Sequence, residues 1–160
     1  MKMEKVVKKR NPRNELQISL WRAKEFYKKL CEISPRVEEL NQHMVTEADE
    51  LEFMELKLIR IAFWVALIIE IGRLFDTYDK PKKRVISLKN FFNDSDSIAE
   101  INRIHGQMII SQIIKTRNTY TAHISDDFNI PNSVKSICES NLGTLLNDVD
   151  TLLSGVKLQV

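Results

Sequence analysis

Apolar residues recur at intervals of three and four positions through most of this chain, and that spacing restricts the chain to helices. Within positions 14–33 they fall on one stripe of a helix, formed by Leu16, Leu20, Ala23, Tyr27 and Leu30. The same rhythm returns between Val134 and Leu152. No segment alternates apolar and polar residues over the length of a strand. The sequence therefore predicts an all-α fold.

Local signals in the first half of the chain predict where helices begin and end. Ser34 followed by Pro35 is typical of a cap and a first-turn proline, so one helix should end there and a second should begin. Thr46 opens the capping-box sequence TEAD, and the longest helical pattern runs from there to Phe75. Pro81 ends any helix that approaches it.

The second half of the chain contains shorter helical patterns. One spans about positions 88–92, and Ser97 with Glu100 forms another capping-box pattern. The helix that follows is expected to run from about position 98 into the sequence RNTYTAH, at 117–123. A polar loop then separates it from the closing helix.

These helices predict a single domain. The chain has 160 residues, of which 43% are hydrophobic and 29% charged, which suffices for one core. Four or five helices with short connections favour an up-and-down bundle over positions 14–155, preceded by a basic tail at 1–13. The longest apolar run, IAFWVALII at 61–69, is far shorter than the about 20 residues of a membrane span. It predicts a buried core helix and no membrane partner.

Positive charge is unevenly distributed along the chain. The formal net charge of +2 is too small to identify a nucleic-acid-binding protein by itself. However, the tail is rich in Lys and Arg, and a second basic cluster, KPKKR, occupies positions 80–84. We predict that Lys82, Lys83 and Arg84 bind RNA phosphates. A solvated loop is the alternative interpretation of this cluster.

The sequence predicts neither a metal site nor a disulfide. Cys31 and Cys138 lie far apart and belong to no CxxC or Cys/His cluster, which favours two reduced thiols in a cytoplasmic protein without a signal peptide. Acidic residues cluster at 47–55, but carboxylates in the first turns of a helix also complement its dipole. His43 and His105 stand alone and complete no ligand set. With four glycines, the chain also lacks a glycine-rich phosphate loop, so no cofactor is expected.

The polar sequence RNTYTAH is the best candidate for chemistry. RNA can be cleaved when its own 2'-hydroxyl attacks the adjacent phosphate. This reaction requires a proton acceptor for that hydroxyl, a proton donor for the leaving 5'-oxygen and positive charge beside the phosphorane. His123 titrates in the useful pH range and can exchange these protons. Arg117 stays charged and can hold phosphate oxygens, while Asn118 can orient the phosphate or the imidazole. Together these residues supply the groups for phosphodiester cleavage without a metal.

This arrangement of an arginine, a polar residue, several further residues and a histidine resembles the signature of HEPN domains. The resemblance implies an all-α, metal-independent ribonuclease that acts as a homodimer, with paired motifs facing one cleft. A second likeness, of IEIGRLFDTYDK and VISLKNFF to the AbiU-like abortive-infection branch, extends the resemblance over roughly positions 15–150. It implies a toxin or phage-defence enzyme, with an antitoxin or other regulatory protein as a further partner.

Arg73 and Asp76 match the AbiU-like branch. They lie one helical turn apart, which allows either an intrahelical ion pair or a supporting role beside the catalytic pocket. HEPN toxins paired with a nucleotidyltransferase antitoxin often carry a tyrosine two residues after the histidine, as a modification target. This chain has Ser125 there, so control through that tyrosine is not expected.

The spacing of the motif poses a geometric problem, because Arg117 and His123 would point about 120° apart on a regular helix. Either the helix bends or ends within 118–122, or a second histidine comes from a partner subunit, as the resemblance favours. If a monomer suffices, Tyr120 is the first candidate for the missing catalytic group. The sequence thus predicts an endoribonuclease. The alternatives are a non-catalytic HEPN module that binds RNA, nucleotide or a protein partner, and a structural helical adaptor.

Overall fold

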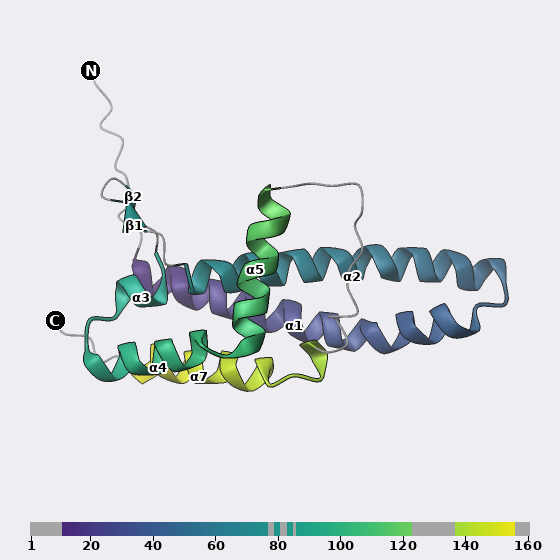
Figure 1. Cartoon of the computed structure of the whole chain (residues 1–160). Helices are drawn as coiled ribbons and strands as arrows, with labels where there is room; N and C mark the ends of the chain where they lie inside the picture. The colour runs from purple at the N-terminus through teal and green to yellow at the C-terminus, as the bar shows by residue number, and fades with distance from the viewer. Residues whose placement is uncertain (1–10, 77–78, 81–82, 85, 123–136, 156–160) are drawn as a thin grey trace, which may run out of the picture.

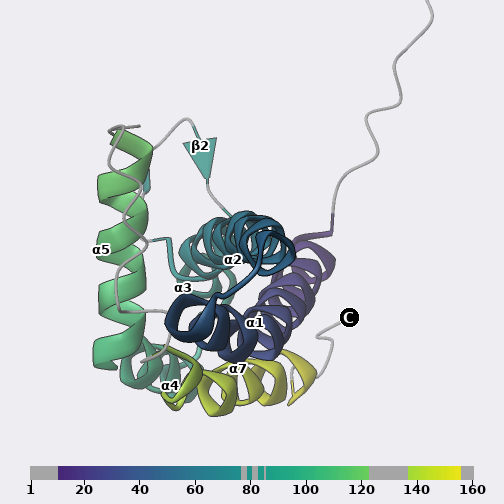
Figure 2. The same cartoon turned by 90° about the vertical axis from the view of Figure 1, so that its right-hand side faces the viewer.

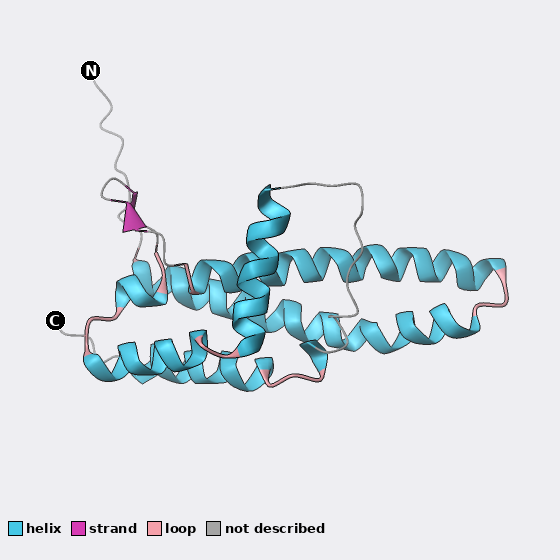
Figure 3. Cartoon of the chain, viewed as in Figure 1, coloured by secondary structure: helices cyan, strands magenta, loops and turns pink. Residues whose placement is uncertain are grey.

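The computed structural model describes residues 11–76, 79–80, 83–84, 86–122 and 137–155, with side chains for all but 79–80, 83–84 and 119–122. This part of the chain contains six helices and one hairpin of two-residue strands (Figure 3). The prediction of an all-α helical bundle is confirmed. No helix among the described residues combines the length and the apolar content that a membrane span requires.

Two long antiparallel helices form the frame of the fold (Figure 1). They are α1 (Pro12–His43) and α2 (Glu47–Leu74). Asn11 begins α1 by accepting a hydrogen bond from the N–H of Arg13 at 3.0 Å. The predicted apolar stripe of α1 is confirmed, since Leu16, Leu20, Ala23 and Leu30 are all buried and Tyr27 packs partly buried against the same core.

Helix α1 continues through Pro35, so the boundary predicted there is wrong. The hydroxyl of Ser34 donates to the carbonyl of Leu30 at 2.6 Å instead of capping a new helix. Leu30, Val37 and Leu40, on both sides of the proline, are buried. Burial of each such side chain contributes about 1.5–3 kcal/mol, which together exceeds the cost of about 3 kcal/mol for an interior proline.

The predicted capping box at the start of α2 is confirmed. Thr46 accepts a hydrogen bond from the N–H of Asp49 at 3.1 Å, and the Asp49 carboxylate accepts one from the N–H of Thr46 at 2.9 Å. The Thr46 hydroxyl, followed by the N–H groups of Thr46 and Val45, holds the pKa of Asp49 below its ordinary value. Glu52, one turn further on, pairs with Arg36 of α1 at 2.7 Å. Two of the acidic residues at 47–55 thus have a structural role.

The remaining elements are short: β1 (Asp79–Lys80), β2 (Lys83–Arg84), α3 (Leu88–Phe91), α4 (Ser95–His105), α5 (Met108–Ala122) and α7 (Leu142–Gly155). Strands β1 and β2 pair antiparallel. Helices α4 and α7 lie on one side of the α1–α2 frame, and α5 crosses the frame steeply (Figures 1 and 2). The core lies where these layers meet, with Leu67 of α2, Ile113 of α5 and Leu146 of α7 almost fully buried.

The single helix predicted from about position 98 into RNTYTAH is two helices, because α4 ends at His105 and α5 begins at Met108. Gly106 lies at the break, where a glycine costs a continuous helix about 0.5–1 kcal/mol relative to alanine. The predicted cap at Ser97 is also wrong. The Asp94 carboxylate accepts the N–H of Ser97 at 2.8 Å and begins the helix earlier. The break allows α5 to turn away from α4 and cross α2.

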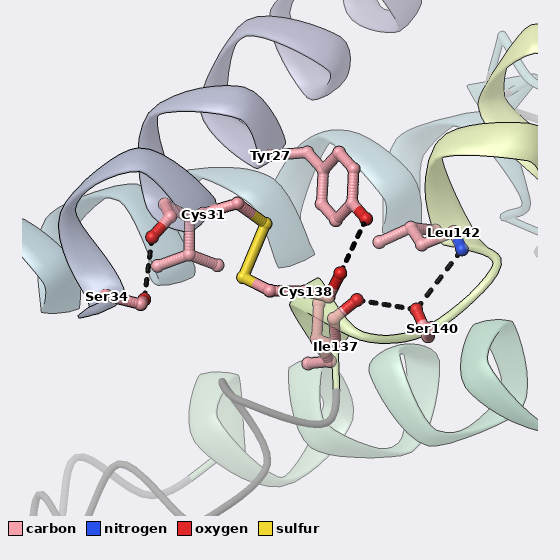
Figure 4. The surroundings of a disulfide bond; sticks show 8 residues. Tyr27, Cys31, Ser34, Ile137, Cys138, Ser140 and Leu142 are labelled. Carbon is pink, nitrogen blue, oxygen red and sulfur yellow. Dashed lines mark hydrogen bonds between the residues drawn. A yellow bond between two sulfur atoms is a disulfide. The ribbon is translucent and has the colours of Figure 1, made fainter. Parts of the chain in front are cut away.

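A disulfide joins Cys31 of α1 to Cys138, which lies in the helical turn that precedes α7 (Figure 4). The prediction of two reduced thiols is therefore wrong. The cysteines are 107 positions apart in sequence, yet their Cα atoms are 5.3 Å apart. Tyr27, one turn before Cys31 on α1, donates to the carbonyl of Cys138 at 3.3 Å. Two side chains of α1 thus hold the same turn.

Candidate functional site

Arg117 lies near the end of α5 and contacts the C-terminal end of α2. Its Nη1 donates to the carbonyl of Gly72 at 2.8 Å, and its Nη2 donates to Oδ2 of Asp76 at 3.2 Å. The side chains of Arg117 and Asp76 are 26% and 20% exposed, so the ion pair is partly shielded from water. These two hydrogen bonds link α5 to the end of α2 and hold the guanidinium in one orientation.

Gly72 is the residue that admits Arg117 to this position. A Cβ atom at position 72 would lie 2.6 Å from Nη1 of Arg117 and closer still to its Cδ. Any other residue would therefore push the guanidinium away from α2. The sequence motifs do not assign Gly72 a role. The signal that points to it is an isolated glycine within an apolar helical run, which often marks the close approach of another group.

Replacement of Gly72 by alanine should lower the free energy of unfolding by up to about 2 kcal/mol, because overpacking costs about 1–3 kcal/mol and alanine recovers about 1 kcal/mol of helix propensity. Urea denaturation measures the change. Gly155→Ala is the matched control, since a Cβ atom there meets nothing within 4 Å. Equal effects of the two substitutions on stability would show that Arg117 does not depend on the space at Gly72.

The contact between Arg117 and Asp76 joins the two sequence stretches that carry the family resemblance. Arg117 opens RNTYTAH, Asp76 belongs to IEIGRLFDTYDK, and they are 41 positions apart. Arg73 lies elsewhere on α2. Its Nη1 is 3.4 Å from Oε2 of Glu70, and its Nη2 is 3.9 Å from Oε2 of Glu15 on α1. The structure therefore brings Asp76, and not Arg73, to the candidate arginine.

Asn118 and the residues after it occupy the last turns of α5. The side chain of Asn118 is exposed. Helix α5 continues to Ala122 and therefore includes the whole segment 118–122. Tyr120 belongs to this helix, although its side chain lies outside the described part of the structure. The candidate proton-transfer residue, His123, lies outside the described residues.

The basic cluster follows directly after the end of α2. Lys83 and Arg84 form β2, whose backbone is described without its side chains, and Lys82 lies outside the described residues. The hairpin begins at Asp79, three positions after Asp76. The basic cluster is therefore next to the candidate site along the chain.

Among the described residues, no group of three or more His, Cys, Asp or Glu side chains is arranged to hold a metal ion. Of the acidic residues at the start of α2, Asp49 takes part in the capping box and Glu52 pairs with Arg36. The polar groups of Gly72, Asp76 and Arg117 form a cluster that joins the two candidate sequence stretches.

The sequence matches no protein-family model, and neither a curated protein nor a solved structure shows significant similarity to the chain.

Proposed function

We propose that the protein is a metal-independent endoribonuclease of the HEPN type. It acts on RNA in the cytoplasm as a toxin or phage-defence effector, under the control of an antitoxin or other regulatory protein. The observation that supports this proposal is the 3.2 Å contact between Arg117 and Asp76. Each of these residues belongs to a separate stretch that resembles the family, and residues of one active site must meet in space.

In the proposed reaction, the 2'-hydroxyl of RNA attacks the adjacent phosphorus. A bond forms between the 2'-oxygen and phosphorus as the bond to the 5'-oxygen breaks. His123 exchanges protons with these two oxygens. Arg117 stabilises the negative charge that develops on the phosphorane, and Asn118 orients the phosphate or the imidazole. No step requires a metal ion.

Asp76 and Gly72 act as positioning residues in this proposal. The carbonyl of Gly72 accepts a hydrogen bond from Nη1 of Arg117, and the carboxylate of Asp76 accepts one from Nη2. These two bonds fix the orientation of the guanidinium. The arginine therefore loses little side-chain freedom when a phosphate binds, which favours binding and transition-state stabilisation.

A non-catalytic HEPN-like module that binds RNA, nucleotide or a protein partner is the second candidate. In this alternative, the Arg117–Asp76 ion pair only holds the end of α5 against the end of α2 and takes no part in chemistry. Incubation of the purified protein with total RNA separates the two candidates. Retained binding of RNA without cleavage would favour the second.

We further propose that the enzyme is a homodimer. Helix α2 carries exposed apolar side chains opposite its buried face, namely Leu51 (69% exposed), Met54 (51%), Leu58 (63%) and Ile69 (44%). An exposed apolar row of this kind favours association with a second surface. Ile69 lies one turn before Gly72, so a second copy that packs there lies beside α5 and its motif.

Mixing two inactive variants tests the dimer. Arg117→Ala chains and His123→Ala chains should each fail to cleave RNA. In an equal mixture, about half of the dimers combine one chain of each kind, and such a dimer retains one Arg117 and one His123. We expect partial return of cleavage on mixing, measured with a labelled RNA. Leu58→Glu in both chains should prevent this return by weakening association. A monomer at micromolar concentration that still cuts RNA would contradict the model.

Loss of charge from the KPKKR cluster should weaken RNA binding and flatten its dependence on salt, because each neutralised phosphate releases counterions. The variant replaces Lys82, Lys83 and Arg84 with glutamine. Removal of three contacts lowers the slope of log K against log salt by about 2–3.

The control for this experiment removes three positive charges elsewhere, at the exposed residues Lys28, Lys57 and Lys89. Filter binding at several salt concentrations measures both slopes. Equal slopes for the cluster variant and the wild-type protein would mean that the hairpin is a solvated surface.

A further inference from the structure

The disulfide borders a groove that opens to solvent. The groove has a volume of about 440 Å³ and is lined by Cys31, Ser34, Pro35, Glu38, Cys138 and Glu139. Neither cysteine is fully buried. Small-molecule sites commonly have volumes of about 300–1,000 Å³, so the groove can hold a molecule of that size beside the sulfur atoms.

We propose that the Cys31–Cys138 disulfide is a reversible thiol–disulfide exchange site, and that low-molecular-weight thiols reach it through this groove. Structural disulfides that resist reduction are typically shielded, whereas exposed ones react with small thiols. This inference does not depend on the proposed cleavage of RNA.

The exchange takes place in two balanced steps. The thiolate of a small thiol attacks one sulfur, forms a mixed disulfide and releases the other cysteine as a thiolate, which takes up a proton. A second small thiol then attacks the mixed disulfide. The two small thiols leave together as a small disulfide, and the remaining cysteine is released as a thiol. Two electrons and two protons pass from the two small thiols to the protein, and the reverse steps restore the disulfide.

Non-covalent contacts keep the turn in place when the disulfide opens. Tyr27 holds the carbonyl of Cys138 at 3.3 Å, and Ile137 is only 2% exposed. The hydroxyl of Ser140 donates to the carbonyl of Ile137 at 2.6 Å and accepts the N–H of Leu142 at 3.1 Å (Figure 4). The two thiols therefore stay close together and can form the disulfide again, as a reversible site requires.

Acidic side chains at the groove select among thiols by charge. Two carboxylates, Glu38 and Glu139, are among the residues that line it, no basic side chain is among them, and Glu38 pairs with Arg60 at 2.7 Å. A cationic thiol is attracted to such a border and an anionic thiol is repelled. Cysteamine, which carries a positive charge, should react faster than mercaptopropionate, which carries a negative one.

The experiment measures reduction of the native protein by cysteamine and by mercaptopropionate at low salt, with free thiols trapped by a maleimide and counted by mass spectrometry. Each rate is divided by the rate of the same thiol with urea-unfolded protein, which removes differences in intrinsic reactivity. We expect a ratio of cysteamine to mercaptopropionate of roughly threefold or more. Glu38→Gln combined with Glu139→Gln should bring the ratio towards one, and the control pair Glu47→Gln and Glu50→Gln should not.

Three outcomes would overturn the proposal. They are free thiols that persist after air oxidation of the purified protein, reduction that requires urea, and a charge ratio that the Glu38 and Glu139 substitutions leave unchanged. Re-formation of the disulfide after removal of the thiol, with recovery of the original melting temperature, is the expected result for a reversible site.

Discussion

Replacement of His123 by alanine is expected to lower the rate of RNA cleavage by about 10²–10⁴-fold, because general acid–base catalysis contributes on this order. Arg117→Ala should have a similarly large effect, since loss of a single group that stabilises developing charge costs about 10²–10³-fold. Cleavage of a labelled RNA by the purified proteins measures both effects. Addition of a chelator should leave the wild-type rate unchanged, because no proposed step involves a metal ion.

His43→Ala is the control for this prediction, since His43 is an exposed histidine at the end of α1. Its activity should equal that of the wild-type protein. Thermal unfolding of each variant separates a lost catalytic group from a lost fold. Cleavage that survives in His123→Ala, or that disappears when a chelator is added, would contradict the proposed mechanism.

Loss of the Cys31–Cys138 disulfide is expected to lower the free energy of unfolding by about 2–5 kcal/mol, because the bond closes a long loop and restricts the unfolded chain. The cysteines are separated by 107 positions, which places the expected effect towards the upper end of that range. The corresponding fall in melting temperature is roughly 5–15 °C. The double substitution Cys31→Ser and Cys138→Ser removes the bond permanently, and calorimetry or circular dichroism measures the change.

Reduction of the wild-type protein provides the second arm of this experiment. A reducing agent should lower the melting temperature of the wild-type protein towards that of the double variant and leave the double variant unchanged. This design separates the effect of the bond from the effect of the serine side chains. Equal melting temperatures for oxidised and reduced wild-type protein would show that the disulfide contributes nothing to stability.

Local sequence signals predicted the start of α2 correctly, because residues within one turn of each other decide it. The capping box of Thr46 and Asp49 involves residues three positions apart, and it forms as predicted. Pro35 shows the limit of such signals. Its local preference for a helix start is outweighed by buried leucines on both sides, which depend on packing against α2. Ser97 shows a second limit, because Asp94, an equally local residue, takes the capping position.

The sequence by itself determined the all-α class, the apolar face of α1 and the start of α2, since these depend on periodicity and on residues within a turn of each other. Only the tertiary structure decided that Arg117 meets Asp76 across 41 positions and that Cys31 meets Cys138 across 107. Those meetings depend on how α5 crosses α2 and on how the turn before α7 packs on α1. Such packing results from the joint burial of many side chains, which no short stretch of sequence specifies.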